Sequence, residues 1–399
     1  MKVARLFRYD GRAMFSRRTQ WKMTPNRLSI AIAEAHASGR EILDLTISNP
    51  TRAGIIYDRA AIVDSLGTER ALDYDPQPKG LLPARQAVAQ YYAERGEQVD
   101  AERLFLTGGT SEGYSYLFRL LANPDDEILI PAPSYPLFEF LADLDDVRLV
   151  SYPLIYDHSW QMDFHSLANA ITPRSRAIVL LNPNNPTGSY VSAKERETLN
   201  EICHRHRLAL IVDEVFLDYD HDCGRRSTFA LNQDVLTFTL SGLSKICALP
   251  QMKLAWIAAS GPANDRTEAE QRLEVIADCY LSVGAPVQWA AASLLLQRQD
   301  IQQQLFERIS ANVLELDRQL DSQRTCTRLT VEGGWYAILR VPVTQSDEDL
   351  AIKLLEGHRV LVHPGHFYDF PTDGYVVISL IGTKPEFREG VSRLFEFFA

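Results

Sequence analysis

A lysine follows an apolar run near the middle of the chain, where a solubilising charge would be poorly placed. The run Val235–Leu240 leads into Ser241-Gly242-Leu243-Ser244-Lys245. An amine in surroundings of reduced polarity can lose its proton and attack a carbonyl carbon. Because a lone lysine is usually a surface charge, the residues that accompany Lys245 decide how it is interpreted.

Two more polar segments follow apolar runs and supply a carboxylate and an amide. Asp213 and Glu214 come directly after the run Leu208–Val212. A carboxylate at the end of a buried strand can anchor a cationic ring nitrogen, and the alternative is an N-cap or a surface acid. Asn185 lies within Leu181-Asn182-Pro183-Asn184-Asn185-Pro186-Thr187-Gly188, whose prolines and glycine indicate one rigid loop that aims an amide inward.

A turn of small residues follows a fourth apolar run and opens a helical pattern. It reads Leu106-Thr107-Gly108-Gly109-Thr110-Ser111-Glu112. Small residues such as Gly109 let an anion approach the backbone, and the hydroxyls of Thr110 and Ser111 can join helix N-terminal amides in binding phosphate oxygens. For this turn alone, a plain strand–turn–helix with an N-cap is about as good an interpretation.

Short apolar runs alternate with amphipathic stretches in the part of the chain that carries these segments. Strands are predicted over Arg103–Leu106, Glu127–Ile130, Val147–Ser151, Ala177–Leu181, Leu208–Val212, Val235–Thr239 and Leu254–Ala258. Helices are predicted over Leu81–Arg95, Ser111–Leu121, Leu137–Leu144 and Ala193–Arg207. This alternation indicates an α/β fold with a mostly parallel sheet covered by helices on both faces. Ligands of such sheets bind beyond the carboxyl ends of the strands, which is where the polar segments lie.

The two ends of the chain are expected to build a smaller α+β domain. A helix is predicted from Thr24 as N-cap, with Pro25 at its first position, to Gly39. A long helical stretch over Pro286–Leu320 precedes a strand–helix–strand–helix tail. We therefore expect an N-terminal arm and helix over residues 1–45, a large domain over 46–285 and a small domain over 286–399.

Composition excludes several classes of function. Of the 399 residues, 46% are hydrophobic and 23% are charged, as in ordinary globular proteins, and the formal net charge is −11. An acidic surface repels phosphates, so we expect neither a nucleic-acid partner nor an anionic membrane. No apolar run has the length of a membrane span, and Asp10 with Gly11 interrupts the basic N-terminal segment, which argues against a targeting signal.

The cysteines indicate a reducing compartment and no metal site. The five cysteines are scattered and show no CxxC spacing, which favours free thiols in a cytoplasmic protein. Cys203 with His204 and His206 is conceivable as a metal site. Because no second cluster completes it, the helical-surface interpretation is favoured and no metal is expected.

Together these segments resemble the class I/II aminotransferases, the fold-type-I pyridoxal-phosphate enzymes. The resemblance rests on Asn-Pro-x-Asn-Pro-Thr-Gly, Asp-Glu-Val and the lysine segment, and it runs from about Leu43 to the C-terminus. It implies that Lys245 forms a Schiff base with pyridoxal 5′-phosphate and then moves a proton between cofactor and substrate. It further implies that Asp213 pairs with the ring nitrogen, which makes the ring an electron sink, and that Asn185 binds the phenolic oxygen.

The resemblance assigns further cofactor contacts. Tyr135 falls where the family stacks an aromatic ring on the cofactor. Gly109, Thr110 and Ser111 match the phosphate-binding turn. Tyr74 resembles a tyrosine that reaches the phosphate across a dimer interface, which implies a homodimer.

Four positions depart from the family pattern. Phe216 replaces a tyrosine whose hydroxyl reaches the phenolic oxygen, unless Tyr219 or another group substitutes for it; we expect a more basic Schiff base. Gly242 replaces a frequent serine, with Ser241 one place earlier as a cofactor contact. Lys253 replaces an arginine on the phosphate and keeps its charge but not its bidentate geometry.

The fourth departure concerns the substrate. Val377, in Tyr375-Val376-Val377-Ile378-Ser379, stands where the family carries an arginine that clamps the substrate carboxylate. Either another cation replaces that arginine or the substrate lacks the carboxylate. Arg52 and Asn49, in Ser48-Asn49-Pro50-Thr51-Arg52, are candidate substrate contacts, although an exposed loop arginine is an equally good interpretation. For His363 and His366, a place in the pocket and a place on the surface are equally good interpretations.

The implied function is transamination between a small-molecule amino donor, an amino acid or amine, and an oxo acid or aldehyde acceptor. The same residues also support a pyridoxal-phosphate-dependent decarboxylase or lyase acting on an amino-acid-derived substrate, because substrate orientation decides which bond breaks. A third interpretation, an effector-sensing domain of this fold, is disfavoured because the first 40 residues hold no basic DNA-binding module.

Overall fold

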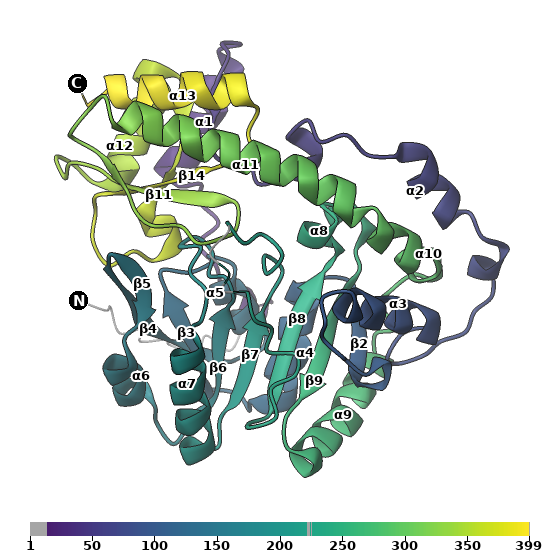
Figure 1. The fold of residues 1–399 in the computed structure, drawn as a ribbon. Coiled ribbons are helices and arrows are strands. Elements are labelled where there is room, and N and C mark those ends of the chain that lie inside the picture. Colours follow the sequence, from purple (N-terminus) through teal and green to yellow (C-terminus); the bar gives the residue numbers. More distant parts are fainter. Residues whose placement is uncertain (1–13, 222–223, 225, 399) are drawn as a thin grey trace.

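A computed structural model describes residues 14–221, 224 and 226–398. The arm arginines Arg5, Arg8 and Arg12 lie outside the described residues, as does Cys223. Two groups of elements are visible in Figure 1, a large sheet with its helices below and a smaller sheet with α1, α12 and α13 above. The α/β fold class predicted from the sequence is confirmed.

The large sheet has eight strands in the order β2-β9-β8-β7-β6-β3-β4-β5. The strands are β2 (Leu104–Thr107), β3 (Glu127–Ala132), β4 (Arg148–Asp157), β5 (Ser159–Met162), β6 (Ser175–Leu181), β7 (Ala209–Asp213), β8 (Thr237–Gly242) and β9 (Ala255–Ser260). The pairings from β4 through β3, β6 and β7 to β8 are parallel, whereas β5, β9 and β2 join antiparallel. The central strands therefore end at one edge of the sheet.

Strand alternation explains why helices cover both faces of this sheet. In β6, Ala177 and Val179 pack on one face and Ile178 and Leu180 on the other. The first face is covered by α4 (Thr110–Leu121), α5 (Phe138–Leu144) and α9 (Ala263–Asp278). The second is covered by α6 (Phe164–Ala170) and α7 (Ala193–His206), and toward β2 by α3 (Leu82–Ala93) and α10 (Ala285–Leu296).

The smaller sheet has the order β10-β11-β14-β13 and is antiparallel. Its strands are β10 (Thr327–Arg328), β11 (Tyr336–Arg340), β13 (His363–Pro364) and β14 (Tyr375–Ser379). It packs with α12 (Asp347–Lys353) and α13 (Lys384–Glu396) in one core. A separate parallel pair joins β1 (Leu43–Asp44) to β12 (Val360–Leu361), so the N-terminal segment enters this core, as predicted.

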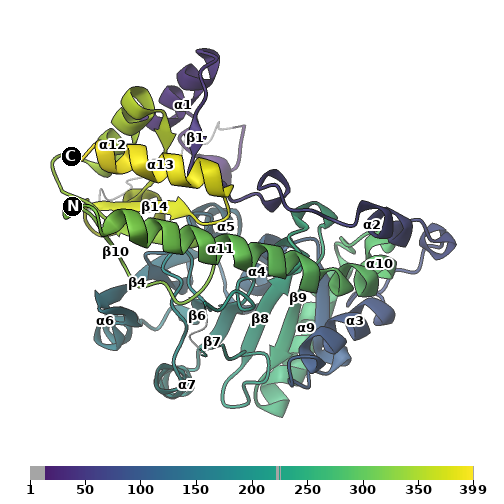
Figure 2. The same ribbon diagram turned by 45° about the horizontal axis from the view of Figure 1, so that its top comes forward.

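Two helices, rather than one long stretch, connect the two sheets. α10 ends at Leu296 and α11 (Arg298–Leu320) begins after Gln297. α10 packs on α3 and on α2 (Arg59–Leu66) beside the large sheet, and α11 runs from there to α13. Figures 1 and 2 both show α11 running from α10 to the smaller sheet.

The N-terminal helix begins later than predicted. α1 (Arg27–Ala37) has Asn26 as its N-cap, because the Asn26 amide oxygen accepts the Ser29 backbone N–H at 2.7 Å. The assignment of Thr24 as N-cap was therefore wrong, whereas Gly39, at φ +66°, follows the helix end as expected. The described part of the arm packs on the body, where Arg18 donates to Asp146 at 2.6 Å and Trp21 to Asp143 at 3.0 Å.

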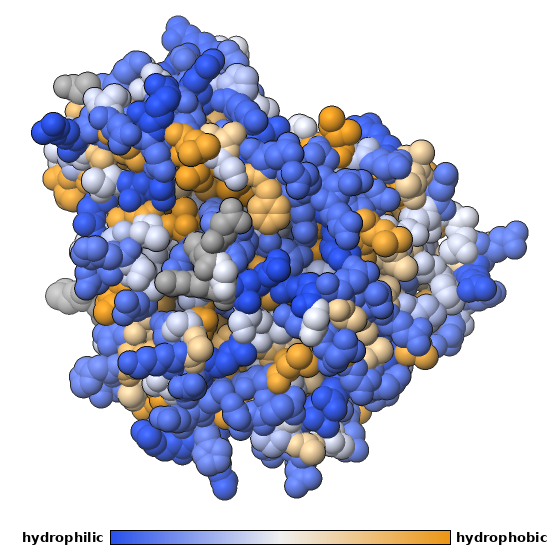
Figure 3. All heavy atoms as spheres, in the orientation of Figure 1, coloured by the Kyte–Doolittle hydropathy of each residue, from blue (hydrophilic) through white to orange (hydrophobic). Residues whose placement is uncertain are grey.

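The surface and the cysteines agree with the composition. On the face in Figure 3, hydrophobic residues form scattered patches among hydrophilic ones. Among the described residues, no helix combines the length and apolarity that crossing a bilayer requires. The described cysteines are free thiols, and no cluster of three or more His, Cys, Asp or Glu in that part of the chain could hold a metal ion.

Asn312 fastens α11 to the segment that follows β14. Its side-chain amide is buried and donates to the carbonyls of Leu380 at 2.8 Å and Gly382 at 2.9 Å. We predict that Asn312→Ala lowers the free energy of unfolding by about 1–3 kcal/mol, because the buried Leu380 carbonyl loses its side-chain donor and the Gly382 carbonyl keeps only the longer bond from Arg308. Urea denaturation measures this loss. Gln303→Ala, on the exposed side of the same helix, is the control, and equal effects of the two substitutions would contradict the assignment.

Candidate active site

A cavity of about 270 Å³ lies at the edge of the large sheet where the parallel strands end. Segments that follow β3, β6, β7 and β8, and the turn that opens α4, contribute to it. The predicted site residues that line it are Gly109, Thr110, Ser111, Tyr135, Asn185, Asp213, Lys245 and Lys253. The structure therefore brings together the four polar segments that the sequence pattern singled out.

Lys245 lies on α8 (Leu243–Ile246), the short helix directly after β8. Burial lowers the pKa of its amine to about 8, and the nearby Asp213 carboxylate opposes that shift. The amine lies over two aromatic rings, 4.8 Å from the centroid of Trp335 and 5.4 Å from that of Phe216. A neutral amine is thus accessible near physiological pH, as a nucleophile for a carbonyl carbon requires.

Gly242 lets the lysine segment turn close to β9. A Cβ at this position would lie 2.8 Å from the Ala255 Cβ and 2.9 Å from its Cα, so a larger residue would displace the backbone. This close approach accounts for a glycine where the family often has serine. Ser241 is buried in β8 and its hydroxyl donates to the Glu214 carbonyl at 3.4 Å, so the structure does not bring it to the cavity. Ser244 lines the cavity instead.

Asp213 ends β7 and its carboxylate is buried. One oxygen accepts the Val215 backbone N–H at 3.1 Å, and the other accepts the Tyr114 hydroxyl at 3.1 Å. Burial raises the pKa of this carboxyl to about 6, while the Val215 amide, the Tyr114 hydroxyl and the Lys245 amine oppose the shift. At neutral pH the group is therefore mostly an anion in a site of low polarity, suited to pairing with a cation.

Asn185 lies in a loop that packs closely against Gly333, just before the smaller sheet's strand β11. Gly188, at φ +70°, has the Gly333 carbonyl oxygen 2.4 Å from where a Cβ would be, so only glycine fits here. Its backbone N–H donates to the Asn184 carbonyl at 2.7 Å and closes the loop. Asn185 is buried and its side-chain oxygen has no hydrogen-bond partner within the described structure. An unpaired buried amide oxygen beside a cavity is an acceptor that a ligand carrying a hydrogen-bond donor would satisfy.

The small-residue turn presents an anion-binding surface. Glu112 accepts the Gly108 backbone N–H at 2.6 Å and so fixes the turn, while Thr110 and Ser111 line the cavity. A Cβ at Gly109 would lie 3.1 Å from the Lys253 amine, so this small residue lets the cation come close. A helix N-terminus, two hydroxyls and a lysine together suit a phosphate group.

Several residues that line the cavity or contact Asp213 were not found by sequence reasoning. Tyr336, on β11 of the smaller sheet, and Ser48, in the N-terminal segment, reach the cavity from parts of the chain distant in sequence. Tyr114 contacts Asp213 from the first turns of α4. Its position four residues after Thr110 would have placed it on the same helix face, which is the signal that could have found it.

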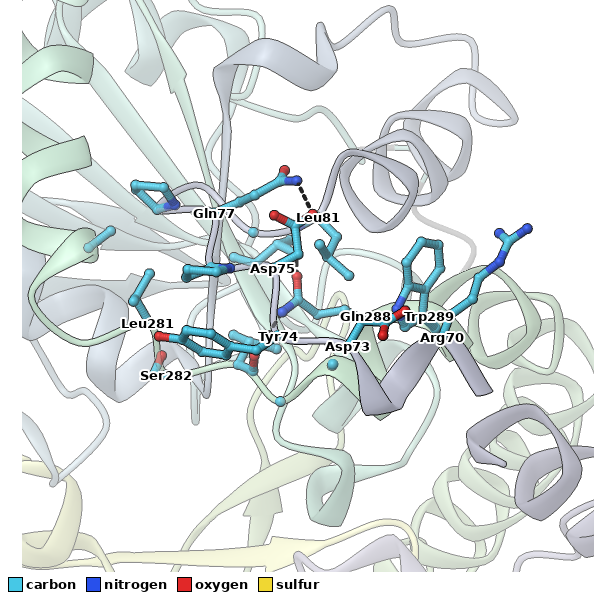
Figure 4. Close-up of a pocket in the computed structure, with 18 of the residues that line it drawn as sticks. Arg70, Asp73, Tyr74, Asp75, Gln77, Leu81, Leu281, Ser282, Gln288 and Trp289 are labelled. Carbon is cyan, nitrogen blue, oxygen red and sulfur yellow. Dashed lines mark hydrogen bonds between the residues drawn. The ribbon is translucent and has the colours of Figure 1, made fainter. Parts of the chain in front are cut away.

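The structure does not bring Tyr74 to this cavity. Tyr74 is 84% exposed and lines a separate cavity of about 550 Å³. Figure 4 shows this second cavity, with Gln288 and Trp289 of α10 among the residues that line it. Within one chain, Tyr74 therefore makes no contact with the Lys245 cavity.

The expected substrate contacts lie outside the cavity lining. Asn49 caps a short 3₁₀ helix by accepting the Thr51 backbone N–H at 3.1 Å, and Arg52 is exposed on that helix. His366 is exposed, whereas His363 is partly buried 3.0 Å from the Tyr368 hydroxyl.

The structure shows where Val377 and Tyr219 lie, the residues that bear on the missing carboxylate-binding arginine and on the hydroxyl missing at Phe216. Val377 is fully buried in β14, opposite Ile338 and His363, and supplies no cation. The Tyr219 hydroxyl donates to the Lys245 carbonyl at 2.8 Å, so it does not replace the hydroxyl missing at Phe216.

Comparison with known proteins agrees with this geometry. The glutamate-pyruvate aminotransferase AlaA of Escherichia coli K12 is 33% identical over 260 residues, a match that spans 64% of this chain and 64% of that protein. The enzyme of the same name from Haemophilus influenzae is 27% identical and covers 90% of this chain and 91% of its own length. The alanine aminotransferase of Mycobacterium tuberculosis is 27% identical and covers 92% of this chain and 87% of its own length.

Solved structures and the family comparison point the same way. An aminotransferase from Escherichia coli superposes with a TM-score of 0.82 at 26% identity, covering 92% of this chain and 94% of the other. The family described as Aminotransferase class I and II matches residues 40–394. Because this match spans nearly the whole chain, the protein belongs to the class I and II aminotransferases.

Proposed function

We propose that this protein is a pyridoxal-phosphate-dependent aminotransferase that carries its cofactor on Lys245 as a Schiff base. The observation that carries the proposal is the partly buried Lys245 amine, whose pKa burial lowers to about 8, in one cavity with Asp213 and the phosphate-suited turn. The reaction would move an amino group from an amino acid or amine to an oxo acid or aldehyde. The relatives' names favour this over the decarboxylase or lyase alternative.

The residues present fit the cofactor group by group. The turn at Gly109, Thr110 and Ser111, with Lys253, would hold the phosphate. The side-chain NH₂ of Asn185, which lines the cavity, would donate to the phenolic oxygen, and Tyr135, which is half-exposed at the cavity, would stack on the ring. Asp213 would pair with the ring nitrogen and hold its proton there. When bound, pyridoxal phosphate supplies an electron sink for the bond that breaks at the substrate's α-carbon.

Lys245 would carry the proton in each half of the reaction. Because its pKa lies near neutrality, its amine can accept a proton from the substrate carbon and return it elsewhere without a large free-energy penalty. The rings of Trp335 and Phe216 cover part of the amine and so limit its contact with water. Asp213 stays ionised meanwhile, since two hydrogen-bond donors hold its oxygens.

The substrate's carboxylate, where the donor has one, needs a cation that Val377 does not supply. Among the described residues that line the cavity, the cationic side chains are Lys245 and Lys253, which the cofactor would engage. We propose Arg52 as the replacement, together with Asn49 and His366. Arg52 stands four residues after the cavity-lining Ser48, and the 3₁₀ helix of His366 adjoins the Tyr135 segment through the Tyr368 carbonyl, which accepts the Ser134 N–H at 2.8 Å.

The working assembly that fits these residues is a cytoplasmic homodimer. The exposed Tyr74 would reach the partner's cofactor phosphate, which explains a large aromatic ring that is 84% exposed in one chain. The four described free thiols suit a reducing compartment. We also propose three structural units, namely residues 1–45, 46–285 and 286–399, with α10 packed on the large unit although it follows that boundary.

The proposed function is tested by visible spectroscopy of the purified protein with pyridoxal phosphate. We predict a visible absorption band that alanine, glutamate, arginine or simple amines remove with release of the matching oxo product. Lys245→Ala should abolish the band, whereas Lys194→Ala, at an exposed lysine of α7, should leave it unchanged. Carbon dioxide or ammonia released in place of an oxo product would favour the alternative, and an absent band in the folded protein would refute the proposal.

The pKa of Lys245 predicts a pH dependence for cofactor capture. Its amine is protonated below a pH of about 8 and neutral above it, so the rate of covalent capture by the apo-protein should rise across pH 7–9 and then level off. An ordinary lysine, with a pKa near 10.4, would still be gaining rate above pH 9. Stopped-flow absorbance measures the rate, and a rise centred near 10 would contradict the burial of this amine.

Lys253 is predicted to act on the phosphate alone. Lys253→Ala should weaken binding of pyridoxal phosphate by roughly tenfold or more, because a hydrogen bond to a charged group contributes about 1.5–3 kcal/mol. Binding of pyridoxal, which has no phosphate, should change little. Equilibrium titration of the apo-protein with each compound measures both affinities, and an equal loss for the two compounds would show that Lys253 does not contact the phosphate.

A further inference from the structure

The hydroxyl of Tyr114 is the side-chain hydrogen-bond donor to the carboxylate of Asp213. It donates to one carboxylate oxygen at 3.1 Å, while the Val215 backbone N–H donates to the other. Tyr114 is 3% exposed, so bulk water has little access to it. Phenylalanine would fill nearly the same space, so what tyrosine adds at this position is the hydrogen bond from its hydroxyl to the buried carboxylate.

The packing of α4 fixes the position of this hydroxyl. Gly113 faces β8 so closely that a Cβ would lie 2.6 Å from the Leu240 side chain. The Tyr114 ring then packs edge-on against Phe138 of α5, with ring centroids 5.0 Å apart and an interplanar angle of 83°. Helix, strand and neighbouring ring therefore restrict where the phenol can lie.

Few charged groups surround Asp213 in the described structure. Lys245 faces it from α8, Tyr114 from α4 and Tyr135 from the segment before α5. The adjacent Glu214 turns away, since its carboxylate accepts the Thr228 hydroxyl at 2.6 Å and the Phe229 backbone N–H at 2.7 Å. If the Tyr114 hydroxyl were removed, the Asp213 carboxylate would keep the hydrogen bond from the Val215 backbone N–H.

We propose that Tyr114 is a positioning residue that keeps Asp213 ionised and aimed at the ring nitrogen of the cofactor. This inference rests on the proposed function. A hydrogen bond to the charged form of a carboxyl lowers its pKa, so losing the Tyr114 hydroxyl raises the pKa of Asp213 further above its ordinary value. At a given pH more Asp213 is then protonated, and a neutral carboxyl no longer pairs with a ring cation.

The test is the pH dependence of cofactor binding to the apo-protein, with Tyr114→Phe as the variant. The dissociation constant for pyridoxal phosphate, measured by quenching of tryptophan fluorescence, should rise as pH falls and Asp213 takes up its proton. We predict that Tyr114→Phe moves this acidic limb to higher pH by about one to two units. Binding well above the limb should change less, because Asp213 is ionised there in both proteins.

Tyr152→Phe is the matched control. It deletes the hydroxyl of another buried tyrosine, which donates to the Val179 carbonyl at 2.9 Å and not to a titrating group. Both variants should melt within a few degrees of the unmodified apo-protein, and Tyr152→Phe should leave the acidic limb in place. A uniform loss of affinity at all pH values in Tyr114→Phe, or no change at all, would overturn the proposal.

A double substitution isolates the pair. In an Asp213→Asn background, Tyr114→Phe should shift no limb, because the titrating group is gone. A shift that persists in this background would assign the effect to another residue and overturn the proposal. Failure of the proposed function is distinguishable, since an unmodified protein that binds no pyridoxal phosphate would refute that function before any variant is compared.

Discussion

The interaction between the partly buried amine of Lys245 and the buried carboxylate of Asp213 is the one on which the rest of the site depends. Removing an amine and a carboxylate from water disfavours their charged forms, which is why the pKa of the amine falls to about 8 and that of the carboxyl rises to about 6. Each group partly relieves the other. The result is a base that can be neutral and an acid that can be ionised at the same pH, side by side in one cavity.

The parallel sheet provides the geometry for that pair. Because β6, β7 and β8 run parallel, the residues after them meet at one edge, and Asn185, Asp213 and Lys245 lie there although they are tens of residues apart in sequence. Glycines, which have no Cβ, then allow neighbouring segments to pack closely. Gly113 brings α4 onto β8, and Gly242 brings the lysine segment onto β9. The sheet thus sets which residues meet, and the glycines set how closely.

Sequence reasoning could find the residues that follow strands and not those that reach the site by tertiary packing. Apolar runs predicted every strand of the parallel core, so the residues after them could be placed at its edge without coordinates. Tyr336 comes from the other sheet and Ser48 from the N-terminal segment, and no local pattern links either to Lys245. Ser241 failed for a related reason, since strand alternation turned its side chain to the Glu214 carbonyl.

The departures from the family pattern can be explained by their effect on the Lys245 amine and the Asp213 carboxylate. Gly242 preserves the approach of β8 to β9, and Lys253 keeps a cation beside Gly109, so neither disturbs the amine or the carboxylate. Phe216 removes a hydroxyl, and Tyr219 does not restore it because it holds the Lys245 backbone instead. The change makes the surroundings of the Lys245 amine less polar, because the rings of Phe216 and Trp335 lie next to it and Phe216 has no hydroxyl to donate. In the proposed complex with pyridoxal phosphate, the Asp213 carboxylate that Tyr114 and Val215 hold would then set the charge on the ring nitrogen.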